Sequence, residues 1–210
     1  MPSPLYLLRH AETVFNRAAR MQGNEAVTPL TLAGVRQADA MGAALAAHFR
    51  ATAEPVPRLW SSPAPRALQT AAILADHLGI DWFAVRVDAR LRELEVGRWV
   101  GRDYAEIVAS EGEIIDLEHR LFRMPIPGGE HYRDVAARLR AWLDEAGAGP
   151  AVVVSHGITT RVLRGLLVGG RAYEGVPIAP DTPQGTVMRV ADGQEVAICV
   201  GDGARAFRAA

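Results

Sequence analysis

The sequence predicts a three-layer α/β/α fold: a mostly parallel central sheet flanked by helices, with a helical insertion and a C-terminal β-hairpin. Three observations support this prediction. Short apolar runs alternate with amphipathic helical segments, as in βαβ units. The run AVVV at 151–154 is the clearest strand in the chain. Near the end, Asp192-Gly193 separates two apolar runs, which is a strong signal for a two-residue hairpin turn.

The predicted elements follow one another in a regular order. Strands are expected where short apolar runs end at polar residues, at 5–8, 58–61, 85–87, 151–154, 186–190 and 195–200. Helices are expected from Thr31 as cap to about residue 49, from about 65 to the stop at Gly79, over 131–146, and after Gly157. The less regular segment 97–129 is expected to form the helical insertion. No repeat or linker interrupts the 210 residues, so residues 1–210 are expected to form one domain.

The composition limits the classes of partner. With 49% apolar and 22% charged residues the chain resembles a soluble globular protein. The net charge of −1 gives no reason to expect nucleic acid or a membrane as partner. All 23 basic residues are arginines, which are suited to binding phosphate or carboxylate with two hydrogen bonds.

Cysteine usage and the N-terminus indicate the compartment. The single cysteine, Cys199, excludes an internal disulfide and a multi-cysteine metal site, and we expect it to be a buried structural thiol. No segment has the pattern of a secretion signal or approaches the length of a membrane span. A cytoplasmic protein is therefore expected.

Two histidines stand directly after predicted buried strands. The segments LYLLRH and AVVVSHG each run from a strand into a histidine, His10 and His156. Ligands bind at the carboxyl ends of the strands in open α/β sheets, so these two side chains are expected at one edge of the sheet. The helix after His156 would direct free backbone N–H groups towards an anion there.

Five blocks of sequence, taken together, resemble a known family. The first is Arg9-His10-Ala11-Glu12-Thr13 with Asn16, continued by Pro29-Leu30-Thr31-Leu32-Ala33-Gly34 and Gln37-Ala38, and the second is Ser61-Ser62-Pro63-Ala64-Pro65-Arg66-Ala67-Leu68-Gln69-Thr70-Ala71. The third is Leu91-Arg92-Glu93-Leu94 with Gly97, Trp99 and Gly101, and the last two are Gly128-Gly129-Glu130 and Val154-Ser155-His156-Gly157. In this order they are similar to the histidine phosphatase superfamily, the phosphoglycerate mutase-like proteins, over nearly the whole chain.

The resemblance implies a role for each matching residue. His10 would be the nucleophile that forms a phosphohistidine. Arg9, Arg66 and His156 would stabilise the transferring phosphoryl group, so no metal or cofactor is expected. Glu93 would be the general acid and then the base. Further phosphate contacts are expected from Asn16, Gln22 and Gly157, whereas Glu12 and Glu130 are expected to orient other groups.

The family contains both phosphatases and mutases, and this sequence favours a phosphatase of broad specificity. Mutases of this type resemble each other in a longer segment between the acid and the second histidine, with extra basic residues. Here the segment between Glu93 and His156 is short and rather acidic, without an adjacent basic pair. Hydrolysis of small phosphorylated metabolites is therefore expected, with phosphoglycerate mutase activity as the alternative.

Three further questions are open at this point. A non-catalytic phosphate-binding or scaffold protein is an alternative of another class, which would be expected if a residue of the core set were missing. Position 11 carries Ala11 where glycine is more usual, and a required positive φ there would strain an alanine. The C-terminal hairpin offers an edge for pairing two copies, so a homodimer is the alternative to a monomer.

Overall fold

The computed structural model describes residues 4–55 and 57–203. A six-stranded sheet lies at the centre, in the order β10-β9-β1-β6-β2-β3. These strands are β1 (Leu5–Arg9), β2 (Arg58–Ser61), β3 (Arg86–Val87), β6 (Ala151–Ser155), β9 (Val187–Ala191) and β10 (Gln194–Cys199). The four strands β1, β6, β2 and β3 are parallel, and β9 and β10 extend the sheet in antiparallel fashion.

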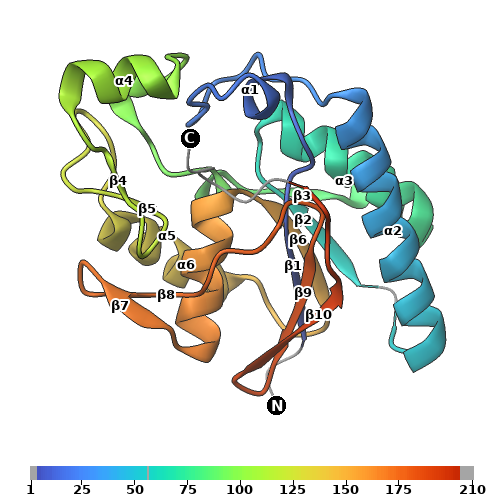
Figure 1. Ribbon diagram of the computed structural model, residues 1–210. Helices are drawn as coiled ribbons and strands as arrows, with labels where there is room; N and C mark the ends of the chain where they lie inside the picture. Colours follow the sequence, from blue (N-terminus) through green and yellow to red (C-terminus); the bar gives the residue numbers. More distant parts are fainter. Residues whose placement is uncertain (1–3, 56, 204–210) are drawn as a thin grey trace.

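Two pairs of helices cover the two faces of this sheet (Figure 1). One face packs against α2 (Leu32–Thr52) and α3 (Pro65–Leu78), and the other against α5 (Tyr132–Glu145) and α6 (Gly157–Val168). Alternate residues of each strand serve the two layers, because successive side chains of a strand point to opposite faces. On β1, for example, Leu7 belongs to the core beside α5 and α6, whereas Tyr6 and Leu8 belong to the core beside α2 and α3. The predicted fold class is confirmed.

Local sequence signals account for the ends of these elements. The Thr31 hydroxyl accepts from the Gly34 N–H and caps α2, as predicted. Gly79 ends α3 in the left-handed conformation with φ 63°. In the hairpin turn, Asp192 and Gly193 have φ of 51° and 71°, as a type I′ turn requires.

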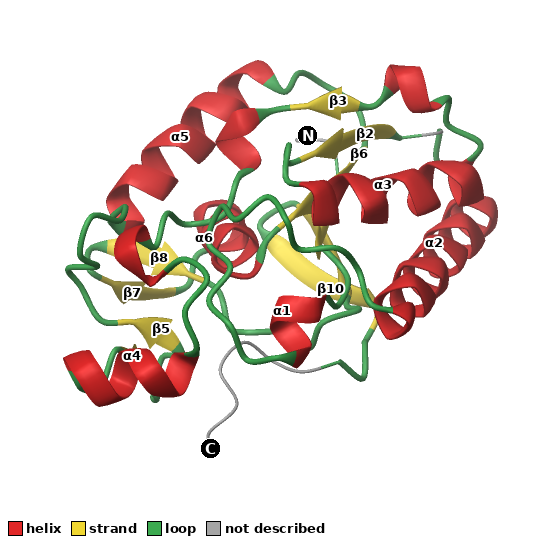
Figure 2. Ribbon diagram, turned by 90° about the horizontal axis from the view of Figure 1, so that it is seen from above, coloured by secondary structure: helices red, strands yellow, loops and turns green. Residues whose placement is uncertain are grey.

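The segment 97–129, which the sequence predicted to be a helical insertion, is only partly helical. It contains the helix α4 (Tyr104–Glu111) and also a two-stranded sheet of β4 (Ile115–Asp116) and β5 (Leu121–Phe122). A second small pair, β7 (Arg171–Tyr173) and β8 (Val176–Ile178), lies on the same side of the molecule (Figures 1 and 2). The sequence pattern predicted neither pair, nor the short helix α1 (Val14–Arg17), because alternation cannot be read from two or three residues. The described part of the chain also has 3₁₀ turns at Trp82–Ala84, Ala89–Leu91 and Gly97–Trp99.

Cys199 lies near the end of β10 and is half-buried, so it is less enclosed than the sequence predicted. Its Sγ lies 3.6 Å from the Gly185 carbonyl oxygen. Burial raises the pKa of this thiol, which makes it a weaker nucleophile at neutral pH. Among residues 4–55 and 57–203, no helix combines the length and the apolar character needed to span a bilayer.

Candidate active site

The register of the two central strands brings the two predicted histidines together. Arg9 on β1 pairs with Ser155 on β6, so His10 and His156 each follow their strand at the same level of the sheet. Their rings are 5.2 Å apart between centroids in an edge-to-face arrangement. Both side chains are buried, with 2% and 0% of their surface exposed. The convergence predicted from the strand ends is therefore observed.

The His10 ring is held in one tautomer. Its Nδ1 lies 2.8 Å from the Ala11 carbonyl oxygen, which can only accept, so Nδ1 carries the proton. Burial, together with the nearby Arg66 and Arg9 guanidinium groups, lowers the pKa of His10 well below its ordinary value. The neutral ring therefore presents the lone pair of Nε2, which accepts a hydrogen bond of 3.2 Å from the Arg66 Nε.

Arg66 joins the two histidines to a covering loop. It is the second residue of α3 and its side chain is fully buried. Its Nε and one Nη2 hydrogen face His10 and His156, the latter through the Nδ1 atom at 3.3 Å. The other N–H groups hold the loop 23–28, donating to the Gly23 carbonyl at 2.6 Å, to the Glu25 carbonyl at 2.9 Å and to the Thr28 hydroxyl at 3.0 Å. Burial lowers the pKa of Arg66 to about 10, so the guanidinium remains charged at neutral pH.

His156 is a neutral member of this cluster. A guanidinium can only donate, so the Nδ1 atom facing Arg66 accepts, and Nε2 donates to the Ser62 hydroxyl at 2.7 Å. Burial and then the charge of Arg66 lower the pKa of His156 well below its ordinary value. The permanent positive charge of the site therefore comes from Arg9 and Arg66, and His156 contributes a polar ring.

Arg9 has a buried nitrogen with no hydrogen-bond partner among the described residues, its Nε. A buried N–H without an acceptor is costly, so the Arg9 Nε–H is a donor available to an acceptor atom of a bound group. A methyl group placed on Gly157 would lie 3.6 Å from this nitrogen and 3.7 Å from the Glu93 Oε2. Gly157 therefore keeps the space between Arg9 and Glu93 open.

The Glu93 carboxylate lies at the first turn of α6. Its Oε2 accepts from the Ile158 N–H at 3.3 Å, and its Oε1 accepts from the Thr159 N–H at 3.2 Å and from the Leu94 N–H at 2.9 Å. Free N–H groups at a helix N-terminus favour a negative group at this place. They fix the orientation of the carboxylate at the edge of the pocket.

The weaker sequence candidates, Asn16 and Gln22, lie beside the loop that follows His10. The Asn16 Oδ1 accepts from the Thr13 N–H at 3.1 Å and so caps α1. Gln22 is 8% exposed, and its Oε1 accepts from the Thr13 hydroxyl at 2.8 Å. These bonds link both side chains to the loop that carries His10. Ala11 has a negative φ and a fully buried methyl group, so the usual glycine is not required here.

Two residues of the site were missed by sequence reasoning. Ser62 follows β2 and bonds His156, so the search for polar residues after buried strands would have found it. Gln184 is 2% exposed and its Nε2 donates to the His10 carbonyl at 2.7 Å and to the Asn16 Oδ1 at 3.3 Å. No local signal indicates this residue, because it meets His10 only through the folding of a loop far along the chain.

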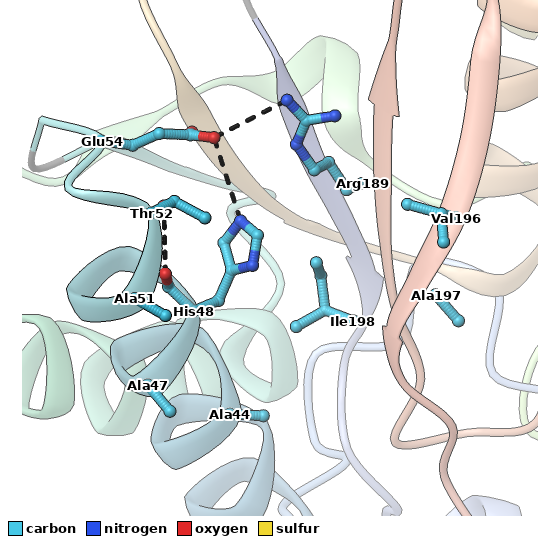
Figure 3. Close-up of a pocket in the computed structure, with 10 residues that line it drawn as sticks. All are labelled: Ala44, Ala47, His48, Ala51, Thr52, Glu54, Arg189, Val196, Ala197 and Ile198. Carbon is cyan, nitrogen blue, oxygen red and sulfur yellow. Dashed lines mark hydrogen bonds and ion pairs between the residues drawn. The ribbon is translucent and has the colours of Figure 1, made fainter.

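An open groove of about 750 Å³ lies elsewhere, between α2 and the β9–β10 hairpin (Figure 3). Alanines of α2 and apolar residues of β10 line most of it. Its polar residues engage one another, since His48 lies 4.0 Å and Arg189 lies 3.6 Å from the Glu54 carboxylate. The Tyr6 hydroxyl also donates to Glu54 at 2.5 Å. The groove therefore takes no part in the cluster around His10.

The sequence profile of the histidine phosphatase superfamily (branch 1) matches residues 5–202. The chain belongs to the histidine phosphatase superfamily. A probable phosphoglycerate mutase, GpmB, of Yersinia pestis is 33% identical over 175 residues, which cover 80% of this chain and 76% of the relative. The superfamily's phosphatases and mutase-like proteins are enzymes, and so is this chain.

Solved structures of relatives extend the match to the fold. A mycobacterial glucosyl-3-phosphoglycerate phosphatase, in a complex with VO₃, has a TM-score of 0.72 and 26% identity, covering 96% of this chain and all of its own. A second mycobacterial protein, described as hydrolase 2, has a TM-score of 0.72 and 28% identity, covering 100% of this chain and 94% of its own. Both phosphatases and a mutase-like protein are thus found among its relatives.

The two buried histidines predict a fall in stability on acidification. Both histidines have lowered pKa values in the folded state. Below about pH 6.5 they are therefore protonated in the unfolded chain while they are still neutral in the folded one. The stability that they contribute is complete above this pH and is lost as the pH falls towards the folded pKa. In this pH range, each histidine that is still neutral in the folded state lowers the free energy of unfolding by about 1.4 kcal/mol for each pH unit of acidification.

The measurement is urea unfolding of wild type, His10→Asn and His156→Asn at pH 7.5 and pH 5.0. The unfolding free energy of each variant should fall less between the two pH values than that of the wild type. Equal falls in all three proteins would contradict the prediction.

Proposed function

We propose that this protein hydrolyses small phosphomonoesters through a phosphohistidine at His10, without a metal ion. The observation that carries the proposal is the His10 Nε2 lone pair, which faces the Arg66 Nε, together with the unpartnered Nε of Arg9, whose charge acts on His10. A phosphoryl group bound there would supply the acceptor that the Arg9 Nε–H lacks. It would also replace His10 Nε2 as the acceptor of the Arg66 Nε–H, so that the lone pair is freed to face phosphorus. Phosphoryl transfer needs chiefly this positioning and charge stabilisation.

The reaction runs in two displacements. The His10 Nε2 forms a bond to phosphorus as the bond from phosphorus to the ester oxygen breaks, and protonated Glu93 gives its proton to the leaving alcohol. Water then attacks the phosphohistidine, the N–P bond breaks, and the Glu93 carboxylate takes the water's proton. Inorganic phosphate leaves and the starting state is restored. Arg9 and Arg66 bind the phosphoryl oxygens in both steps, and His156 joins them by turning its Nε2–H from the Ser62 hydroxyl to one of these oxygens.

Hydrolysis is favoured over mutase activity by the state of the arginines in the segment after Glu93. Arg102 pairs with Glu111 at 3.1 Å, Arg120 with Asp181 at 3.2 Å and Arg123 with Glu113 at 3.6 Å. These cations are therefore engaged by carboxylates of the protein, whereas a mutase needs basic groups for a substrate carboxylate and a retained bisphosphate. A cytoplasmic location belongs to the proposal and is supported by the lone cysteine.

We expect the purified protein to release p-nitrophenol from p-nitrophenyl phosphate at the same rate with and without EDTA. Brief reaction with ³²P-labelled substrate should leave acid-labile, base-stable label on the chain, as a phosphohistidine would. Strict dependence on an added divalent ion, or turnover without labelled protein, would contradict the mechanism.

A phosphoglycerate mutase is the second candidate, favoured by the similarity to GpmB. The two activities are separated by supplying 3-phosphoglycerate with and without 2,3-bisphosphoglycerate. Release of inorganic phosphate supports the phosphatase activity. Rapid isomerisation with little free phosphate would contradict it and support the mutase activity instead. A panel of phosphorylated metabolites then identifies the substrate.

A further inference from the structure

The segment that carries Glu93 has no regular hydrogen-bonded structure of its own. It runs between the 3₁₀ turns Ala89–Leu91 and Gly97–Trp99 and belongs to neither a strand nor an α-helix. A general acid must nevertheless hold its proton within hydrogen-bond reach of the leaving oxygen. Other parts of the chain must therefore fix this backbone.

A buried ion pair packs against this segment. Glu130 precedes α5 and Arg138 lies on it, and their side chains are 14% and 9% exposed. The Arg138 Nε donates to the Glu130 Oε1 at 3.2 Å, and its Nη2 donates to the Oε2 at 3.3 Å. This two-pronged arrangement fixes both side chains, because a guanidinium and a carboxylate match in one plane.

The remaining hydrogen-bonding capacity of this pair is directed at the Glu93 segment. Arg138 donates to the backbone carbonyl of Arg90 through Nη1 and to that of Glu93 through Nη2, the latter at 3.2 Å. The Glu130 Oε2 accepts from the Glu95 N–H at 3.0 Å, while the Glu130 N–H donates to the Glu95 carbonyl at 2.9 Å. The backbone is thus held at Glu93 itself and on both sides of it.

We propose that Glu130 and Arg138 form a positioning pair for the acid–base carboxyl of Glu93. The inference rests on the proposed function, because it requires Glu93 to protonate the leaving group. The side chain of Glu93 is held from the other direction by the first turn of α6. Loss of the pair would release the backbone at Glu93 and Glu95, while the bonds to the Glu93 side chain and those from Ser155 and Thr159 to the Leu91 and Arg92 carbonyls remain. Small displacements of a reacting group are costly.

The dependence on the leaving group distinguishes a positioning role from a general structural one. An aryl phosphate such as 2,4-dinitrophenyl phosphate expels a stable anion and needs no proton, whereas an alkyl phosphate needs one. The value of kcat/KM reports the first displacement, in which the leaving group departs, so it is measured for both substrates. The variants are Arg138→Gln and Glu130→Gln, with Glu93→Gln as reference.

Arg164 provides a matched control. It is an arginine of α6 that is 3% exposed, and it makes a two-pronged pair with Glu195 and donates to the Pro180 carbonyl. Arg164→Gln removes a buried arginine–glutamate pair of the same kind, but one without contact to the Glu93 segment. It reports the effect of a general loss of stability.

We expect Arg138→Gln and Glu130→Gln to lower kcat/KM for the alkyl phosphate by about 30- to 100-fold and for the dinitrophenyl ester by less than about 3-fold. Arg164→Gln should change kcat/KM by the same factor for both substrates. Equal losses on the two substrates in the Arg138 and Glu130 variants, or the same selectivity in Arg164→Gln, would overturn the positioning role.

The failure of the proposed function has a different signature. If wild type hydrolyses neither ester, or Glu93→Gln loses both activities equally, then the acid role of Glu93 falls and the positioning role falls with it. If Glu93→Gln loses more activity on the alkyl phosphate than on the dinitrophenyl ester and the Arg138 and Glu130 variants do not, only the positioning role is contradicted.

Discussion

Replacing His10 by alanine is expected to reduce phosphatase activity by on the order of 10⁴-fold or more and to abolish labelling of the protein by ³²P. The Nε2 atom of His10 is the nucleophile in the proposed reaction, and no neighbouring group can replace it. His156 lies 5.2 Å away between ring centroids, at the end of another strand and with its Nε2 proton donated to Ser62, so it does not take the position of the His10 Nε2. Activity is measured with p-nitrophenyl phosphate.

His48→Ala is the matched control for this experiment. His48 is a partly buried histidine that hydrogen-bonds the Tyr6 hydroxyl at 3.0 Å, beside the groove of Figure 3 and outside the cluster. It should retain activity and labelling. If His10→Ala proves poorly folded, His10→Gln retains a polar side chain of similar reach and should show the same loss. Labelled protein in either His10 variant would exclude His10 as the nucleophile.

Arg66→Gln is expected to lower kcat/KM by about 10²- to 10³-fold, the usual cost of removing a donor directed at developing charge. It should also release the loop 23–28, because the carbonyls of Gly23 and Glu25 lose their donors. Activity and amide hydrogen exchange of this loop are measured on the same variant. Two different effects are thus predicted from one side chain.

Arg58 offers a control with similar bonding and no place at the site. It donates to the carbonyls of Ala146, Gly147 and Gly149 beyond the end of α5. Arg58→Gln should speed hydrogen exchange there and leave kcat/KM within about 3-fold of wild type, as expected of a residue outside the site. Normal activity in Arg66→Gln, or an equal loss in Arg58→Gln, would remove Arg66 from the proposed reaction.

The histidine pair was predictable from local pattern combined with one rule of topology. Apolar runs ending in His10 and His156 predicted two strand ends, and parallel neighbours bring such ends to one edge. Their pairing at equal height required the register of Arg9 with Ser155, which no local signal contains. Arg66 and Glu93 were found through the resemblance of whole blocks, because an arginine near a helix start or an acid in a charged stretch is common.

Protonation and positioning within the site were not predictable in the same way. The tautomer of His156 depends on Arg66 and Ser62, which meet it only after folding. That of His10 depends on the neighbouring Ala11 carbonyl and on Arg66, which is 56 positions away in the sequence. Gln184 reaches the His10 carbonyl across 174 positions of sequence. Glu130 was expected to orient other groups, but nothing in the sequence singles out its partner Arg138, since arginines are common on the polar face of an amphipathic helix.

The sequence by itself determined the main strands and helices and the layers of the fold, and through the family resemblance it identified the candidate reactive groups. Hydrophobic periodicity, caps and turn residues act over a few positions, and they are legible in one chain. Only the tertiary structure decided which charges are buried, which nitrogen of each histidine carries the proton, and which pair holds the Glu93 backbone. Burial and hydrogen-bond geometry depend on atoms from distant segments, and these fix protonation once the chain has packed.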